Sequence, residues 1–273
     1  MTAPAACNAG LPTLDNVPAG HSATTTPRYK RPGPSVGRRW RSDREGPSAT
    51  LSDVGSKKKK PPEPPVLLRV RGLVRRFGEV DVVKGFDLDV AAGTAVALVG
   101  RNGAGKSTVL RCVTGADKPT SGTIELDGET MDERSPKVRA AFAVVMDDMD
   151  FFPDLSVVEH LDLFAKAHRV PDAESVVDGV LHEVGLMPQS GQLPGTLSSG
   201  QKRRLALASA FVRPRRLLIL DEPEQRLDTA GLEWLAERLQ REKSEGLGVL
   251  MASHAPVLVE AVADRVVDVG TRE

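Results

Sequence analysis

A glycine-rich segment at residues 100–108 carries the residue types that bind phosphate. It reads Gly-Arg-Asn-Gly-Ala-Gly-Lys-Ser-Thr, follows an apolar run at residues 95–99, and opens a helical pattern over about residues 106–114. Glycines let the backbone curl so that successive N–H groups point inward at phosphate oxygens, and the helix start adds its positive dipole end. The lysine would reach the β- and γ-phosphates, and the serine hydroxyl could ligate Mg²⁺. The segment therefore predicts a nucleoside triphosphate site, without showing what the energy drives. Its candidate contacts are Gly100, Arg101, Asn102, Gly103, Ala104, Gly105, Lys106, Ser107 and Thr108.

Two adjacent carboxylates, Asp221 and Glu222, end an apolar run at residues 217–220. A strand buried on both faces delivers its C-terminal residues to the ligand edge of an α/β sheet. We expect Asp221 to hold Mg²⁺, usually through water, and Glu222 to polarise the attacking water. Adjacent residues on an extended strand point opposite ways, so the two acids need not compete for one role. The alternative, a strand end with two solvated acids, is disfavoured by the phosphate-binding loop upstream.

The elements that must position these groups alternate between strand and helix patterns. Short apolar runs typical of buried strands recur along the chain, and further strands are expected where apolar and polar residues alternate. The strand candidates are residues 66–70, 86–90, 95–99, 123–126, 143–146, 217–220 and 249–252. Helical spacing is expected over residues 154–190 and around residues 232–239. Strands separated by helices predict a mostly parallel sheet covered on both sides, and the absence of an internal repeat predicts a single nucleotide cassette.

Composition excludes several classes of protein. Thirty-seven basic and thirty-seven acidic residues cancel over the 273 residues, so bulk charge gives no case for nucleic acid binding. The two cysteines, Cys7 and Cys112, lack metal-ligand spacing, which argues against a zinc site or a disulfide framework and favours a reducing, cytosolic setting. No run approaches the roughly 18–20 apolar residues that cross a bilayer, and the start has no secretory signal pattern, so we expect a soluble chain.

Residues 1–65 differ in texture from the rest of the chain. They contain eleven of the twenty prolines and no Ile or Phe, and we expect them to be disordered because they cannot bury enough apolar surface. Eleven Lys or Arg against five Asp or Glu make this stretch basic, with four lysines at residues 57–60. Docking on anionic lipid headgroups is one interpretation. A solvated tail, or a start codon placed too far upstream, is the simpler one.

Residues 197–201, Leu-Ser-Ser-Gly-Gln, followed by Lys-Arg-Arg-Leu-Ala-Leu-Ala, lie just upstream of the Asp221 strand. Ser198 is a plausible helix N-cap, and Gly200 permits close approach of a phosphate to the helix start. The stretch resembles the signature motif of the ABC (ATP-binding cassette) ATPase family, with Ser199 in place of the usual first glycine, and the resemblance covers about residues 66–273. It implies an α/β fold: a P-loop NTPase core with a mostly parallel sheet, an antiparallel β edge subdomain, and a helical insert subdomain at about residues 154–198.

The resemblance also implies roles for single residues. Phe77 matches the aromatic that stacks on adenine, although a lone Phe is more often a core residue. His254 matches the switch histidine that contacts the γ-phosphate. Three other histidines, His160, His168 and His182, have no such context and are expected at the surface. In the family the signature residues, here Ser198, Ser199, Gly200 and Gln201, complete the ATP site of a facing subunit.

Two departures from the family pattern bear on activity. Asp147 stands where the family carries a glutamine; a carboxylate can still ligate Mg²⁺, but its charge and reach differ. Residues 224–226 read Glu-Gln-Arg where small residues are usual. By resemblance these bulky groups lie at the contact between two cassettes, which makes symmetric closure as a homodimer less certain.

The resemblance implies an ATPase that uses ATP and Mg²⁺ and acts as the ATP-binding subunit of an ABC transporter. Expected partners are a second ATP-binding subunit, identical or not, and an integral membrane permease on a separate chain that docks near residues 147–158 and the helical insert. The chain would then lie on the cytoplasmic face of the membrane. No nucleic acid partner is expected. The alternatives are a non-transport ABC ATPase in translation or DNA maintenance, and a weakly hydrolytic nucleotide switch.

Overall fold

A computed structural model describes residues 64–132, 134–147 and 149–270. The disorder expected for residues 1–65 falls almost wholly outside these residues, as do the four lysines at 57–60 and Cys7. In the part of the chain that is described, no helix is both long enough and apolar enough to cross a membrane.

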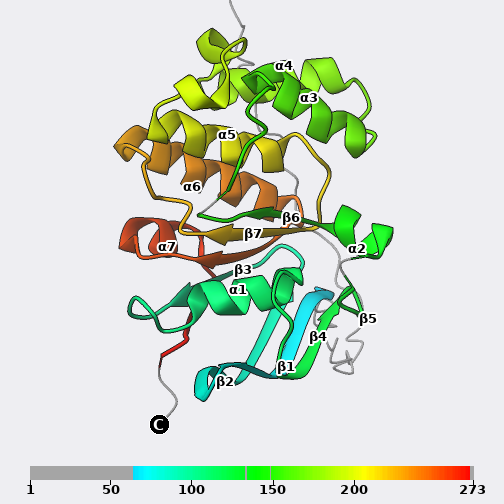
Figure 1. Cartoon of the computed structure of the whole chain (residues 1–273), viewed down its shortest axis with the longest axis vertical. Helices are drawn as coiled ribbons and strands as arrows, with labels where there is room; N and C mark the ends of the chain where they lie inside the picture. The colour runs from blue at the N-terminus through cyan, green and yellow to red at the C-terminus, as the bar shows by residue number, and fades with distance from the viewer. Residues whose placement is uncertain (1–63, 133, 148, 271–273) are drawn as a thin grey trace, which may run out of the picture. The chain divides into compact units, whose positions relative to one another are not determined.

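The secondary structure follows the alternation expected from the sequence (Figure 1). The strands are β1 (Val66–Phe77), β2 (Val80–Ala91), β3 (Ala95–Val99), β4 (Ser121–Leu126), β5 (Glu129–Thr130), β6 (Phe142–Val145), β7 (Leu217–Asp221), β8 (Gly248–Ala252) and β9 (Arg265–Asp268). The helices are α1 (Lys106–Thr114), α2 (Pro136–Ala141), α3 (Val157–Ala167), α4 (Ala173–Glu183), α5 (Ser199–Phe211), α6 (Thr229–Ser244) and α7 (Pro256–Val262). Short 3₁₀ turns cover Met187–Gln189 and Pro194–Thr196.

A parallel sheet with the order β6-β7-β8-β3-β9 forms the centre of the described residues. Its neighbouring strands pair in parallel throughout, and the central strands β7, β8 and β3 are almost entirely buried. Continuous apolar runs are what such strands require, because both faces of the sheet are covered. The mostly parallel sheet predicted from the sequence is confirmed.

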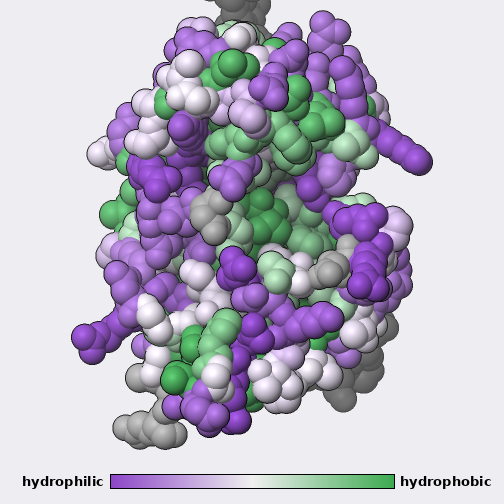
Figure 2. Space-filling model, in the orientation of Figure 1, coloured by the Kyte–Doolittle hydropathy of each residue, from purple (hydrophilic) through white to green (hydrophobic). Residues whose placement is uncertain are grey.

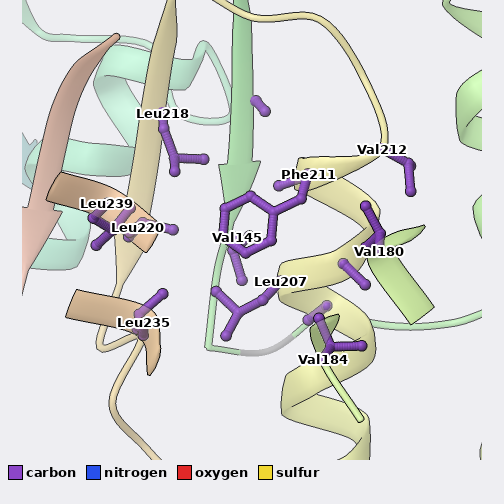
Figure 3. Packing of buried hydrophobic residues seen from close by; sticks show 14 of the residues in the cluster. Val145, Val180, Val184, Leu207, Phe211, Val212, Leu218, Leu220, Leu235 and Leu239 are labelled. Atoms are coloured by element: carbon purple, nitrogen blue, oxygen red, sulfur yellow. The ribbon is translucent and has the colours of Figure 1, made fainter. Parts of the chain in front are cut away.

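Helices and a second sheet cover the two faces (Figure 1). Alternate residues of β7 divide between two cores: Leu218 and Leu220 pack with the side that carries α5 and α6, and Leu217 and Ile219 pack with α1 and the second sheet. Figure 3 shows Leu218 and Leu220 in the same cluster as Leu207 and Phe211 of α5. The period of two along the strand therefore fixes which residues support each layer.

The second sheet is antiparallel, with the order β2-β1-β4-β5. Its apolar side packs against the core that contains α1. This arrangement confirms the antiparallel β edge expected from the family resemblance.

The helical stretch expected at residues 154–190 consists of α3 and α4. The helix α3 begins with a capping box, in which Ser156 and Glu159 satisfy each other's backbone N–H groups. It is separated from α4 by Arg169 and Asp172, both of which have a positive φ angle. The helix α4 then packs on α5, as Val180 and Val184 show in Figure 3.

The surface position expected for His160 is wrong. Its side chain is 1% exposed, accepts a hydrogen bond from the Phe152 backbone N–H at 2.9 Å through Nε2, and has Nδ1 3.0 Å from the Ser156 carbonyl. Because Nε2 accepts, Nδ1 carries the proton and donates to Ser156. This histidine ties the segment before α3 to the helix. His182 is exposed as expected, and His168 is half-buried.

Candidate functional site

The glycine-rich loop runs from the end of β3 to the start of α1. Gly100, Gly103 and Gly105 all have positive φ angles, of 140°, 81° and 100°. Gly105 is the N-cap of α1, so this helix has no capping side chain at its start, and its first turn contains no acidic residue. Unpaired N–H groups and the positive end of the helix dipole are thus left for an external anion.

Gly105 is also required by close packing. A Cβ atom at this position would lie 3.0 Å from the Val82 carbonyl oxygen of β2, closer than ordinary van der Waals contact. The positive φ angle adds backbone strain for any other residue. The loop can therefore pass beneath β2 only with glycine here.

Lys106 points back into this loop. The side chain is 5% exposed, and its Nζ donates to the carbonyl oxygens of Gly100 at 3.1 Å and Arg101 at 3.3 Å. These are neutral acceptors, so the ammonium charge has no carboxylate partner within the described part of the chain. One pocket brings the loop together with the hydrolysis candidate: it is lined by Val82, Asn102, Gly103, Gly105, Lys106, Ser107, Thr108 and Glu222.

Asp221 ends β7 at the same edge of the sheet, beside Ser107. Burial raises the pKa of the Asp221 carboxyl, a hydrogen bond with Ser107 opposes that rise, and the nearby charges of Glu222 and Asp147 add to it. The Oδ1 atom is buried and has no hydrogen-bond partner among the described residues. An orphaned, buried carboxylate oxygen next to a serine hydroxyl is the donor set that Mg²⁺ accepts.

Glu222 lies just beyond the strand rather than on it. Its φ angle is 46°, in the left-handed region, and its backbone N–H donates to the Ala252 carbonyl at 2.8 Å. The argument that the two acids diverge because they alternate along a strand is therefore wrong, since the backbone turns between them. The Glu222 side chain accepts a hydrogen bond from Gln225 and lies 3.5 Å from Nε2 of His254.

Asp147 lies two residues after the end of β6, the strand that pairs with β7. Its Oδ1 is buried without a hydrogen bond among the described residues, 4.0 Å from a guanidinium nitrogen of Arg226. Its charge is close enough to raise the pKa of Asp221. Asp147, Asp221 and Ser107 thus lie in one neighbourhood, as the proposed Mg²⁺ ligands must.

Arg203, which sequence reasoning overlooked, connects the helix α5 to this neighbourhood. Its guanidinium is 2% exposed and donates to the backbone carbonyls of Met146, Asp221, Glu222 and Pro223, at 3.0, 2.6, 2.5 and 3.3 Å. The sequence held a signal for it: Arg203 precedes the buried Leu207 and Ala210 by four and seven residues, the spacing of one helix face.

The residues resembling the signature motif form the start of α5. Ser198 is the N-cap, and it forms a capping box with Gln201, as expected for a helix start. Ser199 is exposed, and Gly200 lies so close to the Arg226 carbonyl that a Cβ would come within 2.9 Å of it. None of these residues lines the pocket formed by the glycine-rich loop and Glu222.

Phe77 lies at the end of β1, with its ring 47% exposed. The guanidinium of Arg75 lies 4.2 Å from the ring centroid. The ring is thus open to stacking rather than part of the core, and the core alternative considered for it does not apply.

Comparisons with known proteins agree with this geometry. The family described as ABC transporter matches residues 83–225. The aliphatic sulfonates import ATP-binding protein SsuB of Pseudomonas putida is 38% identical over 213 residues, covering 75% of each chain. The SkfA peptide export ATP-binding protein SkfE of Bacillus subtilis is 35% identical over 204 residues, covering 74% of this chain and 84% of that protein.

Two solved structures resemble the chain. The ATP-binding subunit of an ABC transporter superposes with a TM-score of 0.70 and 29% identity, covering 75% of this chain and 87% of that one. A dimeric ATP-binding cassette in a post-hydrolysis state, bound to ADP and phosphate, superposes with a TM-score of 0.68. At 22% identity, with 75% of this chain and 95% of that chain covered, it supports the fold alone.

Proposed function

This chain belongs to the ABC transporter family, and we propose that it is the ATP-binding subunit of a transporter whose membrane-spanning part is a different polypeptide. The observation that carries the proposal is the site itself: an uncapped helix start beneath a glycine loop, with a buried lysine and an orphaned buried carboxylate at its edge. A triphosphate supplies the negative charge that the loop and Lys106 lack, and its Mg²⁺ supplies the positive charge that Asp221 lacks.

In the proposed ATP site, different residues of the chain bind the phosphates, the adenine and Mg²⁺. The loop amides from Gly103 to Thr108 hold phosphate oxygens, and Lys106 leaves the loop carbonyls to pair with them. Phe77 offers its exposed ring to adenine. Ser107, Asp221 and Asp147 would hold Mg²⁺, which neutralises charge on the β- and γ-phosphates when bound.

Glu222 is the proposed hydrolytic carboxylate, because it lines the pocket floor beyond the loop. Its carboxylate orients and polarises water for attack on the γ-phosphate. His254 Nε2 lies 3.5 Å from this carboxylate, which supports the proposal that the histidine contacts the γ-phosphate beside Glu222. Glu222 directly follows β7, and His254 lies two residues after the end of β8. The two strands pair with each other, and the Glu222 N–H donates to the Ala252 carbonyl at the end of β8, which brings the two groups together.

Completion of the site requires a second subunit. The pocket is lined by none of Ser198, Ser199, Gly200 and Gln201, which lie at the start of α5, where the helix dipole has its positive end. We propose that these residues close the ATP site of a facing ATP-binding subunit, and that ATP thereby favours the closed pair while hydrolysis reopens it. Residues 224–226 contact groups of their own chain: Glu224 accepts from the His254 N–H, Gln225 donates to Glu222, and Arg226 lies near Asp147. A homodimer is therefore compatible with these bulky residues.

The membrane partner is proposed to contact the side of the molecule that carries α3 and α4. Phe152, Leu163 and Leu193 are exposed apolar side chains there. Figure 2 shows hydrophobic residues gathered over these helices and in a hollow below them. With a membrane partner in place, the chain lies on the cytoplasmic face of the membrane. The proposed organisation is a nucleotide-binding domain at 66–273, with a helical subdomain at about 154–198, and a separate extension that precedes it in the sequence at 1–65.

Glu222→Gln tests the proposal, since it retains the shape of the side chain but removes the base. We expect the purified variant to bind ATP, to form a dimer in sedimentation experiments with ATP and Mg²⁺, and to lose turnover that the unaltered protein shows. A tagged chain solubilised in detergent should copurify with a polytopic membrane protein. Copurification of ribosomes or DNA instead would favour a non-transport ATPase, and a variant that stays monomeric with ATP would favour a nucleotide switch, which the Asp147 substitution keeps as the second candidate.

A further inference from the structure

Glu224 makes an unusual set of contacts for a side chain in a loop between a strand and a helix. Its Oε1 atom accepts hydrogen bonds from the Ser253 hydroxyl at 2.8 Å, the His254 backbone N–H at 2.7 Å and the Ala255 backbone N–H at 3.1 Å. Its Oε2 atom is buried and has no hydrogen-bond partner among the described residues. One carboxylate oxygen thus accepts hydrogen bonds from three consecutive residues, 253–255, about thirty residues away in the sequence.

The loop it holds joins β8 to α7. Ala255 is the N-cap of α7 and has no side-chain acceptor, and Pro256 follows it at the first helical position. The Ala255 N–H donates to the Ser253 hydroxyl oxygen at 3.1 Å as well as to Glu224, whereas Glu224 is the acceptor of the His254 N–H. A carboxylate is a favourable acceptor here because of the helix dipole. Glu224 thus anchors both the His254 backbone and the Ser253 hydroxyl just before α7.

The same loop carries the histidine that faces the hydrolytic carboxylate. The backbone of His254 is fixed by Glu224, and its ring Nε2 lies 3.5 Å from Glu222. The next residue, Gln225, donates from its side-chain amide to the other oxygen of Glu222. Glu224 thereby holds the backbone of His254, and Gln225 holds the carboxylate of Glu222.

We propose that Glu224 is a positioning residue for hydrolysis: its carboxylate fixes the loop at residues 253–255 and so keeps His254 against Glu222. The bulky residues Glu-Gln-Arg at 224–226 then fix the positions of other site residues in the same chain. The catalytic consequence depends on the proposed ATPase function, whereas the structural contact does not.

Amide hydrogen exchange tests the contact without reference to activity. In Glu224→Ala, the His254 N–H loses its acceptor, and we expect it to exchange at least about ten times faster than in the unaltered protein. The Ala255 N–H keeps the Ser253 hydroxyl as an acceptor and should change less. Glu224→Gln keeps an oxygen that can accept the same bonds, so its exchange should stay within about threefold. Glu237→Gln, an exposed site on α6, removes the same charge and serves as the matched control. Unchanged exchange at His254 in Glu224→Ala would overturn the proposal.

Steady-state kinetics test whether the contact acts through His254. Glu224→Ala should lower kcat for ATP about tenfold or more with KM changed less than about threefold, and Glu224→Gln should restore most of kcat. In a His254→Ala background, Glu224→Ala should cost no further activity, because the residue it positions is already absent. An equal loss in both backgrounds would contradict the positioning role. If the unaltered protein shows no turnover while Glu224→Ala still frees the loop, the proposed function fails and the contact stands.

Discussion

Replacing Arg203 with methionine removes the guanidinium that joins α5 to the end of β7 and to the residue after β6. The four carbonyls that it serves, on Met146, Asp221, Glu222 and Pro223, then lose a charged donor. Methionine fills much of the same volume with an unbranched apolar chain, so the change isolates the hydrogen bonds from the packing.

The expected loss of stability is a balance of two effects. A hydrogen bond from a charged donor contributes about 1.5–3 kcal/mol, although bonds made by one group are not additive. Against this, burial lowers the pKa of Arg203, which shows that holding the charge inside the protein carries a desolvation cost that methionine would remove. We therefore expect the free energy of unfolding to fall by about 2–4 kcal/mol, below the sum of the separate bonds.

Urea denaturation measures this difference directly. Lys202→Met is the matched control on the preceding position of α5, where the side chain is only partly buried, and it should change stability by about 0.5 kcal/mol or less. We also expect Arg203→Met to lower ATP turnover more than ATP binding, because Asp221 and Glu222 lose the group that orders their backbone. If Arg203→Met were as stable as Lys202→Met and equally active, the role assigned to this guanidinium would be refuted.

Three further predictions concern single residues. Asp221→Asn should stabilise the nucleotide-free protein by on the order of 1 kcal/mol at neutral pH, because it removes a buried charge whose Oδ1 has no hydrogen-bond partner among the described residues; since burial raises the pKa of Asp221, this gain should vanish in urea titrations as the pH falls below the unfolded value of 3.8. Cys112 should resist thiol reagents at pH 8 until the protein unfolds, because burial raises the pKa of its thiol to about 11; labelling of the folded Cys7→Ser variant at the rate of a free thiol would contradict this. Gly105→Ala should weaken ATP binding at least about tenfold in calorimetry, because its Cβ would lie 3.0 Å from the Val82 carbonyl; unchanged affinity would show that the loop tolerates the shift.

The sequence pattern alone predicted the elements that are marked by a continuous apolar run or by a capping residue. The apolar runs of β3, β7 and β8 predicted the centre of the parallel sheet, and the Ser198–Gln201 spacing predicted the start of α5. The strand β9 was overlooked, because a short edge strand that is mostly exposed carries no continuous apolar run.

Groups whose positions depend on tertiary contacts were harder to predict. His160 lies on the buried face of α3 together with Val157 and Leu161, and this periodicity would have placed it correctly had it been applied to a polar residue. The left-handed backbone of Glu222 and the reach of Glu224 to the loop before α7 have no local signal, because both depend on the pairing of β7 with β8. The departure at residues 224–226 was recognised, but its contacts within the chain could only be found from the structure.

The central claim is that each ATP site combines the glycine loop of one subunit with the α5 start of another, and mixing two inactive variants tests it most directly. Lys106→Ala damages the loop, and Ser199→Glu adds a negative charge at an exposed position on the start of α5, where it favours the helix but repels phosphate. Neither variant should hydrolyse ATP alone. Mixed together, they should regain turnover, because a mixed dimer contains one site with an intact loop and an intact α5 start. If mixed dimers form by sedimentation and turnover stays at the level of the separate variants, the shared site is contradicted.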